Sequence, residues 1–424
     1  MDGDQQAGGF VATGLDGIAP ALQQVVDAGD LAGAVTLIWR NGEVVQVNAV
    51  GFRDLETKAP MRRDTLFRIA SMTKPVTSVA ALMLLEEGKL ALSDPITRWL
   101  PEFAGMRVLK DATGPIDDTY PAPRDITVED LMTHRAGLAY AFTSVGPIAQ
   151  AHEEALGSPL GTPLTPAAWL KGLGSLPLSY PPGQQFHYSH ATEVLGFLVA
   201  RIEEKPVGEV LKTRIFSPLG MADTDFWCPP EKRGRMAKLY KLGEAPGTLE
   251  DVSLPHVEAQ PVFEAGGGGL ISTADDYLTF ARMLLNGGAV DGVRLLKAET
   301  VADMRTNRLS DAQRQVPFMG LPFWLSQGFG LGLSMVLDPE AHQWLGAGSK
   351  GAFGWPGAFG TWWQADPEED LIAIYLIQDS MPLGPEAVAN MSARRGLGAR
   401  AALPVFQKQV YAALGKAAAP APVS

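Results

Sequence analysis

The segments of this chain that favour β-strands lie near its two ends, and a long helix-forming stretch separates them. Near the N-terminus, two β-rich runs meet at Asn41-Gly42, the strongest short signal for a hairpin turn. Near the C-terminus, residues 328–337, 360–366 and 370–378 are again β-rich, and Pro367-Glu-Glu predicts a second tight hairpin. We therefore expect an α+β fold in which both ends of the chain build one antiparallel sheet flanked by helices.

Helix-forming segments supply the covering of that sheet. They are predicted over about residues 14–29 and 400–414, and another helix begins after Thr273 and ends at Gly287-Gly288. Residues 1–91 and 264–424 are thus predicted to form one discontinuous α/β domain. Residues 92–263, where helices alternate with Pro- and Gly-rich connections, are predicted to form a mainly helical inserted domain. The boundary between two such domains is a common place for a ligand-binding cleft.

The composition argues against several classes of protein. The 424-residue chain has a formal net charge of −12 and no cluster of Lys and Arg, so we expect no nucleic-acid partner. Its single cysteine, Cys228, cannot form a disulfide within one chain or a cysteine-rich zinc site, and no cofactor is predicted. The chain has neither a signal-peptide pattern nor an apolar run of about 18 residues. We therefore expect a cytoplasmic protein that does not enter a membrane, as a monomer or a homodimer.

A serine and a lysine lie three residues apart in RIASMTKPV, just before a helix-forming run that ends near Gly88. One helical turn would place the Lys74 amine next to the Ser71 hydroxyl, where it could take the proton. The start of the helix would also present backbone N–H groups to a developing oxyanion. The alternative is structural, because serine is a common N-cap and S-x-x-K arises by chance in a chain with this many serines and lysines.

Two further segments suggest partners for this pair. Tyr188 lies on a loop between a Pro-Pro-Gly turn and a predicted amphipathic helix, where its hydroxyl could hold or transfer the serine proton. The alternative for Tyr188 is a core tyrosine. The glycine-dense run at residues 351–360 precedes a predicted strand, so its backbone can approach a ligand and complete an oxyanion hole.

Together and in this order, the three segments resemble the family VIII carboxylesterases. These belong to the serine β-lactamase/penicillin-binding-protein superfamily and are close in pattern to class C β-lactamases. The resemblance covers about residues 34–378 and includes LMTHRAGL, PPGQQFHYS and GGGGLISTADDYLTFARMLLNGG. It implies a β-lactamase/transpeptidase-like fold. It also implies a nucleophile at Ser71, its base at Lys74, a second proton-transfer group at Tyr188, an acyl-pocket residue at Trp355 and an oxyanion hole from the backbone N–H groups of Ser71 and Ala358.

Two departures from the pattern of penicillin-recognising enzymes bear on the substrate. Trp355-Pro356-Gly357 stands where those enzymes generally have K-T-G, so the lysine that anchors a substrate carboxylate is missing there. His190 replaces the asparagine of their Y-x-N motif, which would hold an acyl side-chain amide. Gly357 and His190 are therefore expected at the substrate, and both changes favour neutral esters over β-lactams.

The sequence thus predicts a serine hydrolase that cleaves small carboxylic esters, with short acyl groups, through an acyl-enzyme on Ser71. Acyl transfer from the same intermediate is one alternative. A β-lactamase or D-alanyl carboxypeptidase is another, and a non-catalytic binding module on this fold is the most remote.

Two other motifs are set aside. Ala347-Gly-Ser-Lys-Gly resembles the nucleophile elbow of α/β-hydrolases, but that elbow needs a preceding strand, a following helix and a later histidine. No histidine follows His342, so Ser349 is expected to have no part in catalysis. His187 and His190 lie close in sequence without a clustered third ligand, so no metal site is predicted.

Overall fold

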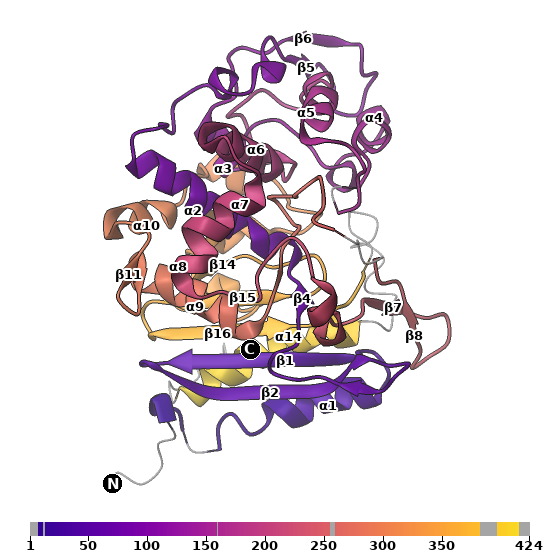
Figure 1. Cartoon of the computed structure of the whole chain (residues 1–424), viewed down its shortest axis with the longest axis vertical. Coiled ribbons are helices and arrows are strands. Elements are labelled where there is room, and N and C mark those ends of the chain that lie inside the picture. Colours follow the sequence, from indigo (N-terminus) through magenta and orange to yellow (C-terminus); the bar gives the residue numbers. More distant parts are fainter. Residues whose placement is uncertain (1–6, 12, 159, 255–258, 382–396, 415–424) are drawn as a thin grey trace, which may run out of the picture.

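The computed structural model describes residues 7–11, 13–158, 160–254, 259–381 and 397–414. Its largest sheet takes antiparallel strands from both ends of the chain, as the sequence predicts (Figure 1). In spatial order the eight strands are β12 (Gln327–Phe329), β13 (Ser334–Val336), β14 (Phe353–Gly354), β15 (Trp362–Asp366), β16 (Leu371–Leu376), β1 (Gly33–Arg40), β2 (Glu43–Asp54) and β3 (Ala59–Pro60).

Both predicted hairpins are present. Strands β1 and β2 pair from Arg40 opposite Glu43, and the turn residues Asn41 and Gly42 have positive φ angles of 51° and 92°, as a two-residue type I′ turn requires. Strands β15 and β16 pair from Asp366 opposite Leu371.

The predicted β-rich run 328–337 differs, because it forms two strands rather than one. Strands β12 and β13 make a hairpin, with Gly332 (φ 91°) in the turn between them. A side chain at Gly332 would collide with Ser78, so the turn presses backbone against a helix of the core.

Helices cover both faces of the sheet. Helices α1 (Ile18–Asp27) and α14 (Leu397–Ala413) share a hydrophobic cluster with one face, as predicted for the terminal helices. On the other face lie α9 (Ala274–Leu285) and α2 (Thr73–Glu86), and nearly every side chain of α2 is buried. Thr273 caps α9 by accepting a hydrogen bond from Asp276 N, which confirms the predicted start of that helix.

The middle of the chain supplies most of the helices that lie above the strands of the large sheet in Figure 1. They are α3 (Val128–Met132), α4 (Pro147–Leu156), α5 (Pro166–Gly174), α6 (Ala191–Glu203), α7 (Val207–Leu211) and α8 (Ser217–Leu219). The same region holds two hairpins, β5 (Arg107–Leu109) with β6 (Thr119–Pro121), and β7 (Tyr240–Leu242) with β8 (Leu249–Asp251). One hydrophobic cluster joins residues of α3 and α6 to residues of the sheet, and the division into two domains stays a prediction.

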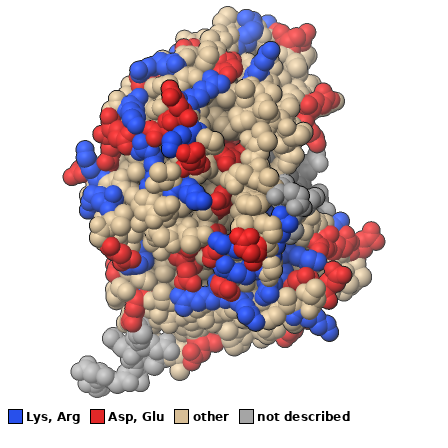
Figure 2. All heavy atoms as spheres, in the orientation of Figure 1, with Lys and Arg blue, Asp and Glu red and all other residues tan. Residues whose placement is uncertain are grey.

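Shorter elements connect these layers. Strands β4 (Phe67–Arg68) and β9 (Ile271–Ser272) pair next to the start of α2, and β10 (Ala289–Val290) pairs with β11 (Val293–Arg294) after α9. Helices α10 (Ala298–Met304), α11 (Asp311–Arg314) and α12 (Pro339–His342) lie along the rest of the C-terminal third. Within the part of the chain that is described, no helix combines the length and the apolar character needed to cross a membrane. On the face shown in Figure 2, acidic and basic side chains are interspersed.

Candidate active site

Ser71 lies in a single 3-10 turn, Ala70–Met72, that leads directly into α2 at Thr73. The residue at the N-cap position of α2 is Met72, so Ser71 is not the helix cap of the structural alternative. The residue before the serine, Ala70, has a φ of 45°, which is unfavourable for a residue with a Cβ atom. Such local strain is found preferentially at functional sites.

The Lys74 side chain is buried, with 1% of its surface exposed, although it carries an amine. Its Nζ lies 2.6 Å from the carbonyl oxygen of Gly267, 3.2 Å from the Tyr140 hydroxyl and 3.3 Å from Ser71 Oγ. Nζ also lies 4.7 Å from the centre of the Tyr188 ring. Lys74 is therefore not an ordinary surface lysine, and the structure brings it to Ser71.

Tyr140 and Glu193 complete this arrangement, and the sequence analysis missed both. The Tyr140 hydroxyl donates to the carboxylate of Glu193, at 3.0 Å from each oxygen. Burial raises the pKa of Glu193, while the nearby Lys74 lowers it. Burial, together with Glu193, holds the pKa of the Tyr140 phenol well above its usual value, so this hydroxyl keeps its proton. The available signal was Glu193 itself, a carboxylate in the otherwise apolar start of α6; Tyr140 has no comparable signal.

Tyr188 and Trp355 lie together next to Lys74. Trp355 Nε1 donates to the Tyr188 hydroxyl at 3.1 Å, and the Tyr188 ring faces the lysine amine. Both rings belong to one aromatic cluster, which also includes Tyr140, Phe186, Trp324 and Phe329. The three motifs singled out in the sequence are thus adjacent in space, but it is Tyr140 rather than Tyr188 whose hydroxyl contacts Lys74.

The segment that contains Gly357 lies against the residues that precede Ser71. Gly357 N donates to Thr361 O at 2.7 Å, and Thr361 Oγ1 donates to Ile69 O at 3.0 Å. A Cβ atom at Gly357 would lie only 2.3 Å from Ile69 O, so no side chain fits at this position. This contact places Ala358 and Ser71 on neighbouring segments, while their role as an oxyanion hole stays a prediction.

The ring of His190 packs against the ring of Tyr140. Its ring centre is 4.3 Å from that of Tyr140, 5.1 Å from that of Trp169 and 5.8 Å from that of His152. Burial holds the pKa of His190 well below its usual value, so the ring is neutral. Contact between His190 and a substrate stays a prediction. Among the described residues, no group of three His, Cys, Asp or Glu side chains is arranged to hold a metal ion.

Ser349 lies in an irregular segment between α12 and β14, flanked by neither of the elements that a nucleophile elbow needs. Its backbone N–H donates to Asp366 Oδ2 at 2.9 Å. The local structure is therefore not that of an α/β-hydrolase.

The chain belongs to the Beta-lactamase family, whose model matches residues 18–397. Its class is therefore that of the serine hydrolases with the β-lactamase fold, in agreement with the antiparallel sheet and the buried helix α2. A Mycobacterium tuberculosis protein, Rv1367c, is 50% identical over 403 residues, which are 95% of this chain and 99% of that protein. Esterase EstB of Burkholderia gladioli is 35% identical over 367 residues, covering 79% of this chain and 83% of the esterase.

A solved structure agrees with these sequence relatives. EstCE1, described as a hydrolase with promiscuous acyltransferase activity, superposes with a TM-score of 0.75 at 26% identity, covering 94% of this chain and 99% of EstCE1. The resemblance to family VIII esterases and the β-lactamase/transpeptidase-like fold are thereby confirmed.

Proposed function

We propose that the protein is a carboxylesterase that forms an acyl-enzyme on Ser71, with Lys74 as the base. The observation that carries the proposal is the set of three atoms around Lys74 Nζ. A neutral amine has two N–H groups and one lone pair. The Gly267 carbonyl and the Tyr140 oxygen each accept one N–H, since the O–H of Tyr140 donates its hydrogen bond to Glu193. The lone pair is then left for the Ser71 hydroxyl at 3.3 Å.

Acylation follows from this arrangement. As Ser71 Oγ attacks the ester carbonyl carbon, its proton passes to Lys74, and the carbonyl oxygen takes the negative charge. Backbone N–H groups of Ser71 and Ala358 would stabilise that oxyanion. The Tyr188 hydroxyl accepts its hydrogen bond from Trp355, so its own proton is available for the leaving alkoxide. The free alcohol departs, and the proton gained by Lys74 balances the one that Tyr188 has lost.

The second half of the reaction decides between hydrolysis and transfer. Water attacking the acyl-enzyme gives the carboxylic acid, whereas an alcohol or amine in the same position gives an acyl-transfer product. Acyl transfer is a second candidate because EstCE1, which shares the fold over nearly the whole chain, is described as having that activity beside hydrolysis.

The proposal is tested by turnover of p-nitrophenyl acetate, butyrate and octanoate, with nitrocefin measured on the same sample. We expect ester cleavage with little or no nitrocefin turnover. Ser71→Ala should abolish ester cleavage, and Ser349→Ala, at the set-aside motif, should leave most of it. Loss of activity in Ser349→Ala with retention in Ser71→Ala would overturn the assignment, and fast nitrocefin turnover would favour a β-lactamase.

A further inference from the structure

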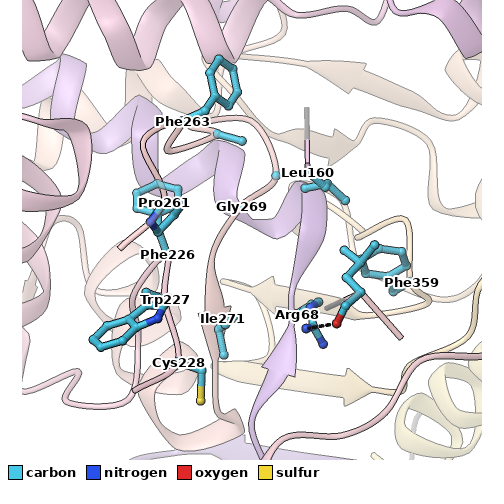
Figure 3. A pocket seen from close by; sticks show the side chains of 13 residues that line it. Arg68, Leu160, Phe226, Trp227, Cys228, Pro261, Phe263, Gly269, Ile271 and Phe359 are labelled. Atoms are coloured by element: carbon cyan, nitrogen blue, oxygen red, sulfur yellow. Dashed lines mark hydrogen bonds between the residues drawn. The ribbon is translucent and has the colours of Figure 1, made fainter. Parts of the chain in front are cut away.

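A cavity of about 110 Å³ lies beside the candidate active site (Figure 3). Most of its walls are apolar, and they include Leu160, Phe226, Trp227, Pro261, Phe263 and Phe359. In Figure 3, Arg68 and Phe359 line one side, and Phe226, Trp227 and Pro261 line the other. Among the described residues of the lining, the charged side chain is that of Arg68 on strand β4. The volume suits a short chain with a small polar end, and it is well below that of a pocket for a drug-sized molecule.

Three parts of the cavity wall are continuous with the candidate active site. Arg68 lies three residues before Ser71, and Phe359 directly follows Ala358. Gly268, also in the wall, directly follows the residue whose carbonyl binds Lys74. A Cβ atom at Gly268 would lie 4.0 Å from the carbonyl carbon of Ala70. A group bound in the cavity is therefore within reach of an ester held at Ser71.

The Arg68 guanidinium is largely buried and has few partners among the residues that the structure describes. It donates one hydrogen bond, from Nη2 to Leu254 O at 3.2 Å, which is the dashed line in Figure 3. In the described ranges of the chain, no Asp or Glu side chain forms an ion pair with it; the nearby ionisable group is the Cys228 thiol. Burial raises the pKa of that thiol, so it is neutral. By contrast, the exposed Arg63 is paired with Asp275 at 2.7 Å.

A guanidinium has five N–H donors, arranged to grip a carboxylate with two parallel hydrogen bonds. Among the described residues one donor of Arg68 has a partner, and the side chain faces the cavity. Burying such a cation without an anionic partner is unfavourable, whereas a bound carboxylate would offset that cost.

We propose that this cavity binds a carboxylate carried by the ester substrate, with Arg68 as the group that recognises it. The inference deepens the proposed esterase function and rests on it. It departs from the neutral-ester preference expected from the missing K-T-G lysine, because Arg68 places a cation on a different segment, upstream of Ser71. The substrate class is then a short ester with a free carboxylate, on either its acyl or its alcohol side.

The test compares anionic and neutral esters in matched pairs. Mono-4-nitrophenyl glutarate against 4-nitrophenyl pentanoate examines the acyl side, and 4-acetoxybenzoate against phenyl acetate examines the alcohol side. For each pair the readout is the ratio of the two kcat/KM values. We expect the wild-type protein to favour the anionic ester in one pair, and Arg68→Gln to lower that ratio about 10- to 100-fold, as loss of a charged hydrogen bond implies. Arg68→Lys should give an intermediate ratio, because lysine keeps the positive charge but lacks the planar guanidinium that donates two parallel hydrogen bonds.

Arg63→Gln is the matched control, since it removes an exposed arginine and should leave both ratios unchanged. Ratios that are the same in wild type and Arg68→Gln for both pairs would overturn the proposal, provided that thermal melting shows the variant folded. If no ester is turned over, the esterase proposal fails, and the carboxylate site is then tested by the binding of glutarate. Glutarate should then raise the melting temperature of the wild type and of Ser71→Ala but not that of Arg68→Gln, and no rise in the wild type overturns the carboxylate site.

Discussion

At the scale of single residues, the buried amine of Lys74 is linked to the buried carboxylate of Glu193 through the Tyr140 hydroxyl. In the proposed mechanism, this lysine accepts a proton in one step and releases it in another. The Tyr140 hydroxyl lies between the two groups, so the carboxylate is near the amine without a direct hydrogen bond to it.

This arrangement predicts the effect of Glu193→Gln. The substitution keeps the shape of the side chain and an acceptor for Tyr140 but removes the buried negative charge. The buried charge then no longer lies next to the amine that is proposed to take the Ser71 proton, so the pH profile of kcat/KM should differ from that of the wild type. The measurement is ester hydrolysis from pH 5 to 9. Glu204→Gln, at the exposed end of the same helix, is the control, and identical profiles for Glu193→Gln and wild type would contradict this role.

Tyr140→Phe removes the hydroxyl that links Lys74 to Glu193 and leaves the charge of Glu193 in place. Without the hydroxyl, one N–H of Lys74 and the carboxylate of Glu193 both lose a buried partner. We expect kcat/KM to fall about 10- to 100-fold, with the fall mainly in kcat, because the lysine lone pair is no longer directed at Ser71. Tyr188→Phe provides the comparison, since it removes the proton proposed for the leaving group. A Tyr140→Phe protein with wild-type kcat would show that Tyr140 is only a packing residue.

At the scale of elements, the loop between β14 and β15 positions the proposed oxyanion hole. Its Gly357 lies so close to Ile69 O and Thr361 Oγ1 that any side chain must push the loop away from the turn that holds Ser71. The contact joins two segments nearly 300 residues apart in sequence.

Gly357→Ala should therefore separate these segments. A displacement of about 1 Å between the two oxyanion donors would lower kcat/KM about 100-fold, and overpacking should lower the free energy of unfolding by about 1–3 kcal/mol. Turnover of p-nitrophenyl butyrate and urea unfolding measure the two effects. Gly234→Ala is the control, because a Cβ atom at that position meets nothing within 4 Å. Wild-type turnover in Gly357→Ala would mean that the loop does not form part of the site.

At the scale of the whole molecule, buried histidines make stability depend on pH. Burial lowers the pKa of His152, His187 and His342 from 6.5 to about 4, and it holds those of His134 and His190 well below their usual value. The unfolded chain binds protons at these side chains near pH 6.5, whereas the folded protein binds them only at lower pH, about pH 4 for the first three. Their contribution to stability is thus fully present above pH 6.5 and is lost as the pH falls toward 4.

We expect the free energy of unfolding to fall by several kcal/mol between about pH 7 and pH 4.5, since one pKa unit corresponds to about 1.4 kcal/mol. Burial raises the pKa of Glu193 and of Asp276, and these two carboxyl groups act in the opposite sense to the five histidines. Paired carboxylates such as Glu87, whose pKa Arg214 lowers to about 2, add their loss only below about pH 4.5. Urea unfolding at half-unit pH steps measures the slope, and His342→Gln, remote from Lys74 in sequence, should reduce it. Constant stability from pH 7 to 5 would contradict the prediction.

The sequence by itself determined the features that depend on neighbouring residues. Asn41-Gly42 specified the first hairpin, Thr273 specified the start of α9, and the three-residue spacing of Ser71 and Lys74 placed both on one side of a helical turn. The order of strands and helices along the chain was enough to predict a sheet built from both ends. Each of these follows from local backbone preference or from a spacing within one turn, so a single stretch of sequence contains the information.

The tertiary structure decided what lies around Lys74 and Ser71. Three segments far apart in the sequence supply the Tyr140 hydroxyl, the Gly267 carbonyl and the Glu193 carboxylate. No sequence pattern at Tyr140 or Gly267 predicts the contact with Lys74. The close approach of Gly357 to Ile69 and the cavity beside Arg68 likewise depend on how loops pack. The physical reason is that burial, which sets charge states and the geometry of hydrogen bonds, belongs to the packed core as a whole and to no single stretch of it.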